Sequence, residues 1–264
     1  MTAPLLDVQS LTDLFPRDPR GLEYSIAYVY AAAALLAFAA EKRIADLWQQ
    51  IAAAHAGNAA AQATAARRVR EALLKATPLI GFPRQQGING LAILRTAVQS
   101  TSPRIAAEIE KDQDAPDDVP AAKRQKRGKE FFRRLYAQHT ERVLQNLNIS
   151  SGGILGDVAV TCVYGDLMAD ERVLNAKESA LMEFVCCYAV SAAPQAKGHM
   201  YGARNMGNSG VEICAATRLV SRIAEVSQLK FDVEGMDFVE KALSDDDYTA
   251  DSNSAVIDAW KWKR

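Results

Sequence analysis

The residues best suited to chemistry lie between Asn175 and Ser209, in NAKESALMEFVCCYAVSAAPQAKGHMYGARNMGNS. The pattern predicts a capped apolar helix carrying Glu178 and Glu183, a break at Pro194, and a second helix carrying His199. An imidazole with one or two carboxylates can transfer protons near neutral pH, because the ordinary pKa of histidine is about 6.5. Acid–base chemistry is therefore what this stretch predicts.

Each of these residues also has a structural interpretation. Asn175 and Glu178 have the spacing of a capping box, which would satisfy the first turn of the helix. Glu183 either faces solvent, which we expect, or is buried with a raised pKa. A lone histidine often belongs to a core, but Gln195 lies one turn before His199 and adds an amide on the same face.

Two further polar residues could line the same cleft. His139 is predicted to lie mid-helix, with Tyr136 and Val143 one turn to either side, and Tyr164 precedes Gly165 as a polar lid residue. Packing with a hydrogen bond is the alternative for both. No HxxxH or ExxH spacing supplies metal ligands, so we expect no metal site.

The elements that must position these residues are predicted to be helices. The window from Ile26 to Ala40, IAYVYAAAALLAFAA, is uncharged but shorter than the roughly 20 residues that a bilayer requires, so it predicts a core helix. Strand-like composition is confined to GGILGDVAVTCVYG and LKFDVEG, and the first is equally compatible with helix. We therefore predict an all-α fold.

The two halves of the chain share a pattern of helix, proline-containing break and small-residue-rich helix. It is carried by REALLKATPLIGFPRQQGINGLAIL and by KESALMEFVCCYAVSAAPQAKGHMYGA. This predicts tandem pseudo-repeats over residues 1–110 and 129–230. The proline-rich, charged residues 111–128 predict a linker, and residues 231–264 predict an acidic tail that ends in two exposed tryptophans, Trp260 and Trp262.

Composition limits the partners and the compartment. With 31 basic and 32 acidic residues the formal net charge is -1, and we expect no nucleic-acid partner. The N-terminus lacks the basic region of a secretory signal, and we expect no membrane partner. The four cysteines form no CxxC pair, which suits a reducing compartment. We expect an intracellular protein, in the cytoplasm, with mitochondrial and peroxisomal locations left open.

The second half resembles the carboxymuconolactone decarboxylase family, which is related to AhpD-like alkylhydroperoxidases. The residues that carry the resemblance are VYGDLMADERVLNAKESALMEF and APQAKGHMYGARNMGNSGVEI, and the first half resembles the N-terminal part of a fungal two-repeat subgroup. The redox-active branch of the family carries CxxCxxxH. The corresponding positions here are Ala192, Gln195 and His199, so the resemblance does not imply a thiol peroxidase.

The resemblance implies an AhpD-like helical bundle that forms a homo-oligomer and needs no cofactor. We expect a lyase or isomerase that acts on a small organic acid, lactone or secondary metabolite. His199 would be the general acid–base and Glu178 its orienting or proton-relay carboxylate. Substrate would be bound by Gln195, Tyr164, His139 and Glu183. The alternative is a non-catalytic scaffold or interaction protein that keeps the fold without the chemistry.

Overall fold

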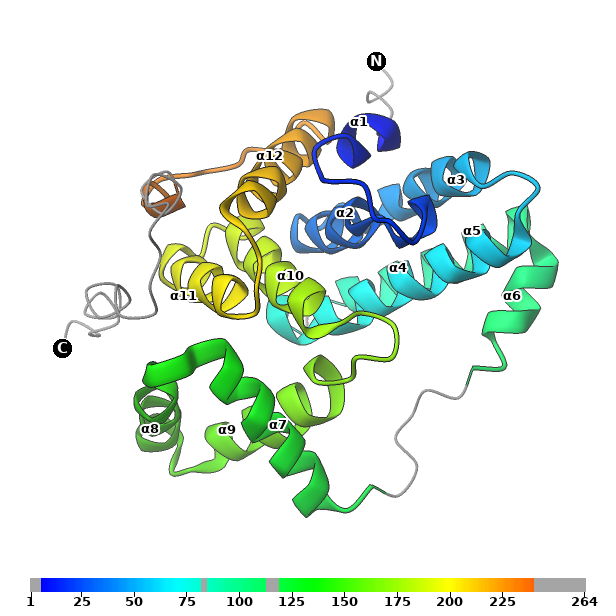
Figure 1. The fold of residues 1–264 in the computed structure, drawn as a ribbon. Helices are drawn as coiled ribbons and strands as arrows, with labels where there is room; N and C mark the ends of the chain where they lie inside the picture. Colours follow the sequence, from blue (N-terminus) through cyan, green and yellow to red (C-terminus); the bar gives the residue numbers. More distant parts are fainter. Residues whose placement is uncertain (1–5, 82–84, 113–118, 240–264) are drawn as a thin grey trace.

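The computed structural model describes residues 6–81, 85–112 and 119–239, and these residues form helices and turns without a strand (Figure 1). This confirms the all-α prediction. The helices before residue 112 are α1 (Val8–Thr12), α2 (Ile26–Ala37), α3 (Ile44–Ala54), α4 (Ala59–Ile80), α5 (Gln86–Thr101) and α6 (Pro103–Ile109). After residue 119 come α7 (Ala121–Tyr136), α8 (Thr140–Ser151), α9 (Ile154–Asp157), a π-helix (Val158–Met168), α10 (Ala176–Ala189), α11 (Ala193–Asn205) and α12 (Gly210–Val226). Short 3₁₀ turns occupy Leu22–Tyr24, Glu41–Arg43 and Ala137–His139.

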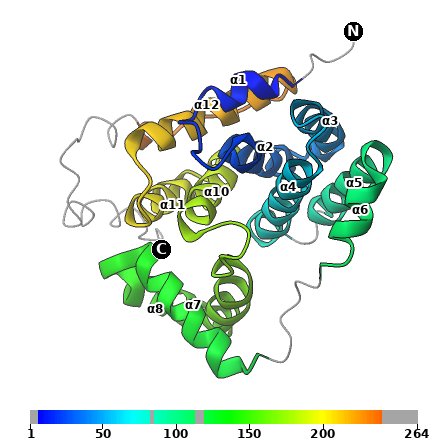
Figure 2. The ribbon, with the colours of Figure 1, turned by 45° about the vertical axis from the view of Figure 1, so that its right-hand side comes forward.

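Helix α2 lies at the centre of the core, as its apolar sequence predicts. Every residue of α2 except Ile26 is buried, because a helix that is apolar on all sides is stable only when other elements surround it. It packs against α4, α10 and α12, and Figures 1 and 2 both show α10 beside α2. Helices from both halves of the chain therefore share one hydrophobic core.

This shared core bears on the predicted domains. The core does not divide between residues 1–110 and 129–230, because α10 and α12 pack directly on the N-terminal helices. The organisation as two tandem pseudo-repeats stays a prediction.

Helices α7, α8 and α9 form, with the π-helix, a lobe on one side of this core (green in Figure 1). The axes of α7 and the π-helix approach very closely at two glycines. A Cβ atom at Gly128 would lie 1.8 Å from the carbonyl oxygen of Val160, and one at Gly165 would lie 2.4 Å from that of Arg124. The crossing therefore requires glycine at both positions.

The predicted linker 111–128 extends too far. Helix α7 begins at Ala121, with Pro120 as its N-cap, rather than at Lys129. The basic cluster inside the predicted linker is the exposed face of an amphipathic helix, whose other face buries Phe131, Phe132 and Leu135. Residues 113–118 of the predicted linker lie outside the described residues.

The first part of the predicted acidic tail packs on the body. The Phe231 ring lies 5.5 Å from that of Phe38 and 5.3 Å from that of Tyr188, measured between centroids. Residues 240–264, which include Trp260 and Trp262, lie outside the described residues. No helix in the part of the chain that the structure describes is long and apolar enough to cross a bilayer.

Candidate active site

A buried carboxylate–imidazole pair joins α10 to α11. The Nδ1 atom of His199 lies 3.0 Å from Oε2 of Glu183. The Glu183 side chain has no exposed surface and the His199 side chain is 11% exposed. The solvent-facing position that we expected for Glu183 is therefore wrong, because its side chain is buried.

The helical hairpin explains why these two residues meet. Helices α10 and α11 are joined by three residues, so they run antiparallel, and residues equally distant from the turn face each other. Glu183 and His199 each lie eight residues from Ser191 at the centre of the turn. Pro194 occupies the first turn of α11, where its missing N–H costs nothing, as the predicted break requires.

Two tyrosines flank the pair. The ring of Tyr136, at the end of α7, lies 6.2 Å from that of His199, and its hydroxyl lies 3.2 Å from the hydroxyl of Tyr164 on the π-helix. Burial first, and then the charge of Glu183, raise the pKa of both phenols. Both hydroxyls therefore stay protonated near neutral pH and can donate hydrogen bonds.

Tyr164 was predicted as a polar lid residue that binds substrate, and that role stays a prediction. Tyr136 was considered only as a neighbour of His139. Tyr136 follows Phe132 by one helical turn, and their rings lie 4.4 Å apart. The sequence signal for Tyr136 was thus its place on the apolar face of α7.

Cys187 lies one turn after Glu183 on α10, and Cys186 is also buried. Burial first, and then the charge of Glu183, raise the pKa of the Cys187 thiol to about 12. The pKa of Cys186 is raised as well, again mainly by burial. Both thiols are therefore protonated at neutral pH and unsuited to nucleophilic attack.

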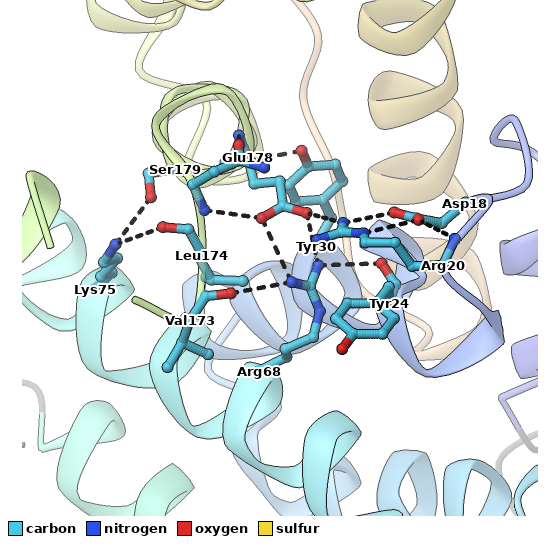
Figure 3. A network of polar contacts seen from close by, with 11 residues as sticks. Asp18, Arg20, Tyr24, Tyr30, Arg68, Lys75, Val173, Leu174, Glu178 and Ser179 are labelled. Atoms are coloured by element: carbon cyan, nitrogen blue, oxygen red, sulfur yellow. Dashed lines mark hydrogen bonds and ion pairs between the residues drawn. The ribbon is translucent and has the colours of Figure 1, made fainter. Parts of the chain in front are cut away.

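Glu178 belongs to a different network, at the start of α10 (Figure 3). Its Oε1 accepts hydrogen bonds from Arg68 at 2.9 Å and from Arg20 at 3.3 Å. Its Oε2 accepts the backbone N–H of Asn175 at 2.9 Å, which completes the predicted capping box. The predicted pairing of Glu178 with His199 is therefore wrong, because Glu178 is held by arginines and His199 by Glu183.

Two buried cations on α4 organise this region. Arg68 also donates to the carbonyls of Val173 and Tyr24, and the Lys75 ammonium donates to Asp170 O at 2.7 Å and Ser179 Oγ at 3.0 Å. Burial lowers the pKa of Lys75, which Glu71 partly opposes. Figure 3 shows both side chains reaching the segment before α10. The sequence signal was their spacing of seven residues, which places both on the inner face of α4.

The other predicted site residues do not join the pair. Gln195 is exposed on the first turn of α11, and His139 is half-buried in the 3₁₀ turn after Tyr136. Within the described ranges, no group of three or more His, Cys, Asp or Glu residues could hold a metal ion. The structure thus gathers Glu183, His199 and Tyr164 from the predicted set and adds Tyr136.

Comparisons with known proteins identify two fungal relatives. "Peroxisomal protein 2" of Schizosaccharomyces pombe is 31% identical over 164 residues, which cover 62% of this chain and 72% of that protein. "Peroxisomal protein 2" of Saccharomyces cerevisiae is 29% identical over 157 residues, which cover 53% of this chain and 54% of that protein. No family model matches the chain. No solved structure matches it either.

Proposed function

The chain belongs to the family of the fungal proteins named Peroxisomal protein 2, and we propose that it is a cofactor-independent lyase or isomerase of the peroxisome. Its substrate class would be a small organic acid, lactone or secondary metabolite. A distant relationship to carboxymuconolactone decarboxylases and AhpD-like proteins, with a two-repeat bundle and assembly into a homo-oligomer, is part of this proposal.

The buried pair of Glu183 and His199 is the observation that carries the proposal. When Nδ1–H donates to the Glu183 carboxylate, the tautomer is fixed and Nε2 carries the lone pair of a general base. After Nε2 takes a proton, the buried carboxylate stabilises the imidazolium. This revises the assignment from the sequence: Glu183, not Glu178, is the orienting carboxylate.

In a decarboxylation, the bond between the substrate carbon and its carboxylate breaks and CO₂ leaves. The electron pair remains on the substrate as an enolate, and the His199 imidazolium would return a proton to carbon. The hydroxyls of Tyr136 and Tyr164 are kept protonated by burial, so they are suited to donate to the developing oxyanion. In an isomerisation the same imidazole would remove the proton at one carbon and return it at another.

The test is CO₂ release from carboxymuconolactone and from a β-keto acid such as acetoacetate. We expect His199→Ala to reduce the rate by roughly 10²- to 10⁴-fold, the usual contribution of a general acid–base. Glu183→Gln should reduce kcat with little change in KM. Gln195→Ala is the matched control for His199→Ala, since Gln195 lies on α11 with His199 but is exposed. An unchanged rate in His199→Ala contradicts the proposal.

A non-catalytic scaffold is the second candidate, because the pair is enclosed. Neither Glu183 nor His199 lines the 680 Å³ cleft of the α7–α9 lobe or the 300 Å³ pocket beside Glu178. If the protein is a scaffold, we expect His199→Ala to lower the free energy of unfolding and the wild-type protein to process none of the substrates above. Size-exclusion chromatography with light scattering tests the proposed homo-oligomer.

We propose the peroxisome, which the sequence left open beside the expected cytoplasm, and the names of the two relatives support this location. Fluorescent fusions at each terminus, expressed in a fungal cell with a peroxisomal marker, test it. Colocalisation by either fusion supports the proposal. Diffuse cytoplasmic or mitochondrial fluorescence from both fusions contradicts it.

A further inference from the structure

A cleft of about 680 Å³ lies between α7, α8 and the segment formed by α9 and the π-helix. That volume lies within the range of small-molecule sites. Phe132 lines the cleft, and its ring lies 5.0 Å from that of Tyr164, between the cleft and the tyrosine pair. The cleft is thus separate from Glu183 and His199.

One wall of the cleft is strongly basic. Helix α7 carries seven lysines and arginines and one acid, Glu130. Arg124 and Arg134 form ion pairs with Asp166 and Glu171.

Lys129 and Arg133 lie one turn apart on α7 and line the cleft, and both are exposed. Neither has an ion-pair partner among the residues that the structure describes. These two cations are therefore available to an anion.

Two acids also line the cleft, and they affect which sign of charge a ligand can carry there. The Oδ1 atom of Asp157 already accepts hydrogen bonds from Gln125 and Thr161, each at 3.2 Å. Glu141 lies on α8, on the wall opposite α7. The two lining cations equal these acids in number, but both cations lie on α7 and Glu141 lies across the cleft, so the field next to α7 favours an anion.

The rest of the cleft combines apolar side chains with uncharged polar ones, which are Gln125, Thr140, Gln145 and Asn148. Phe132 and Val160 are buried at its base, Leu144 is half-buried, and Ile149 is 74% exposed. Residues 143–156 contain no charged side chain, so the charged groups that line this wall are Glu141 and Asp157, at its two ends. A ligand with an apolar body would cover the exposed Ile149 side chain and remove it from water.

From these two walls we propose that the cleft binds a small amphipathic anion, whose carboxylate or phosphate contacts Lys129 and Arg133 and whose apolar chain lies on Phe132, Leu144 and Ile149. The inference does not depend on catalysis by His199, because it concerns binding in a cleft that His199 does not line.

Isothermal titration calorimetry with octanoate tests the proposal. Lys129→Ala and Arg133→Ala should each weaken binding by roughly tenfold, the usual effect of removing a hydrogen bond to a charged group. Lys123→Ala and Lys126→Ala are matched controls, since both lysines are exposed on α7 but do not line the cleft. Equal losses in all four variants would overturn the proposal, because they would indicate a diffuse basic surface.

The apolar contact has its own matched pair. Ile149→Ser should weaken binding several-fold, whereas Ile154→Ser should not, because Ile154 is 70% exposed and lies outside the cleft lining. Both positions are exposed, so both variants should fold, which circular dichroism checks.

The head group is tested with ligands of one chain length. Octyl phosphate bound more tightly than octanoate, with the same dependence on Lys129 and Arg133, would support the site and identify phosphate as its head group. Octanol or octylamine bound as tightly as octanoate would overturn the proposal, as would no binding of octanoate at millimolar concentration. Binding is measured without turnover, so failure of the proposed catalysis leaves these outcomes distinct.

Discussion

At the residue scale, the two carboxylate oxygens of Glu183 have different surroundings. Oε2 contacts His199, whereas Oε1 is buried and has no hydrogen-bond partner among the residues that the structure describes. Buried polar atoms usually have a partner, and one that lacks it lies in many proteins at a functional site. The His199 imidazole is therefore the main group that stabilises the buried Glu183 carboxylate in the folded protein.

This dependence predicts the effect of removing His199. We expect His199→Ala to lower the free energy of unfolding by about 3–5 kcal/mol, because it leaves a buried, unpaired carboxylate. The double variant Glu183→Gln, His199→Ala should recover part of that loss, since it removes the uncompensated charge. Urea denaturation measures both, and additive losses would show that the two side chains are not coupled.

The raised thiol pKa values predict the reactivity of the cysteines. At pH 8 a disulfide reagent such as DTNB should label the exposed Cys162 first and the half-buried Cys214 more slowly. Cys186 and Cys187 should react only after unfolding, because burial raises the pKa of both. Cys162→Ser should remove the fast phase, and rapid labelling of Cys187 in the native protein would contradict the enclosed site.

At the element scale, the crossing of α7 with the π-helix positions Tyr136 and Tyr164 together. Tyr136 comes at the end of α7 and Tyr164 within the π-helix, so their contact depends on how closely these two elements approach. Gly128 and Gly165 permit that approach. Short π-helical segments are frequent at functional sites.

Gly128→Ala tests this crossing, because helix propensity and steric fit predict opposite effects on stability. Helix propensity alone predicts a gain of about 1 kcal/mol, because alanine favours a helix over glycine. The new Cβ would collide with the backbone of Val160, so we expect a net loss of about 1–3 kcal/mol in the free energy of unfolding. Lys126→Ala, exposed on the same helix, should change stability little. A stabilised Gly128→Ala protein would contradict the close crossing.

At the scale of the whole molecule, ion pairs and buried histidine make stability depend on pH. The Arg67 guanidinium beside Asp112 lowers the pKa of that carboxyl, and Arg20 does the same for Asp18. Because these folded-state pKa values lie below the ordinary 3.8, the stabilisation is complete above pH 3.8 and is lost as the pH falls further.

His55 adds a second pH range over which stability changes. Burial lowers its pKa from 6.5, and its Nε2 lies 3.4 Å from the Tyr28 hydroxyl. The unfolded chain therefore binds a proton at a higher pH than the folded protein, and stability falls as the pH drops below 6.5. We predict that urea midpoints decline in two ranges, below pH 6.5 and below pH 3.8. His55→Asn should flatten the first range and Asp112→Asn should reduce the second. A urea midpoint of the wild-type protein that does not change with pH would contradict both predicted declines.

The sequence by itself determined the local structure. Ile26–Ala40 predicted the core helix, Asn175 with Glu178 predicted the capping box, and Pro194 predicted the start of α11. These features depend on neighbouring residues in the chain, so composition and spacing suffice to predict them. The start of α7 was missed because its polar face resembles a linker, and its buried face becomes apparent only against the π-helix.

Only the tertiary structure decided which acid His199 contacts. Glu178 and Glu183 lie five residues apart, so they point about 140° apart around α10. The sequence shows both acids, but the direction of each depends on how α10 packs against other helices. Helix α4 brings Arg68 to Glu178, and the antiparallel α11 brings His199 to Glu183. Because these contacts join residues distant in the chain, spacing within α10 could not distinguish the structural carboxylate from the one in the candidate site.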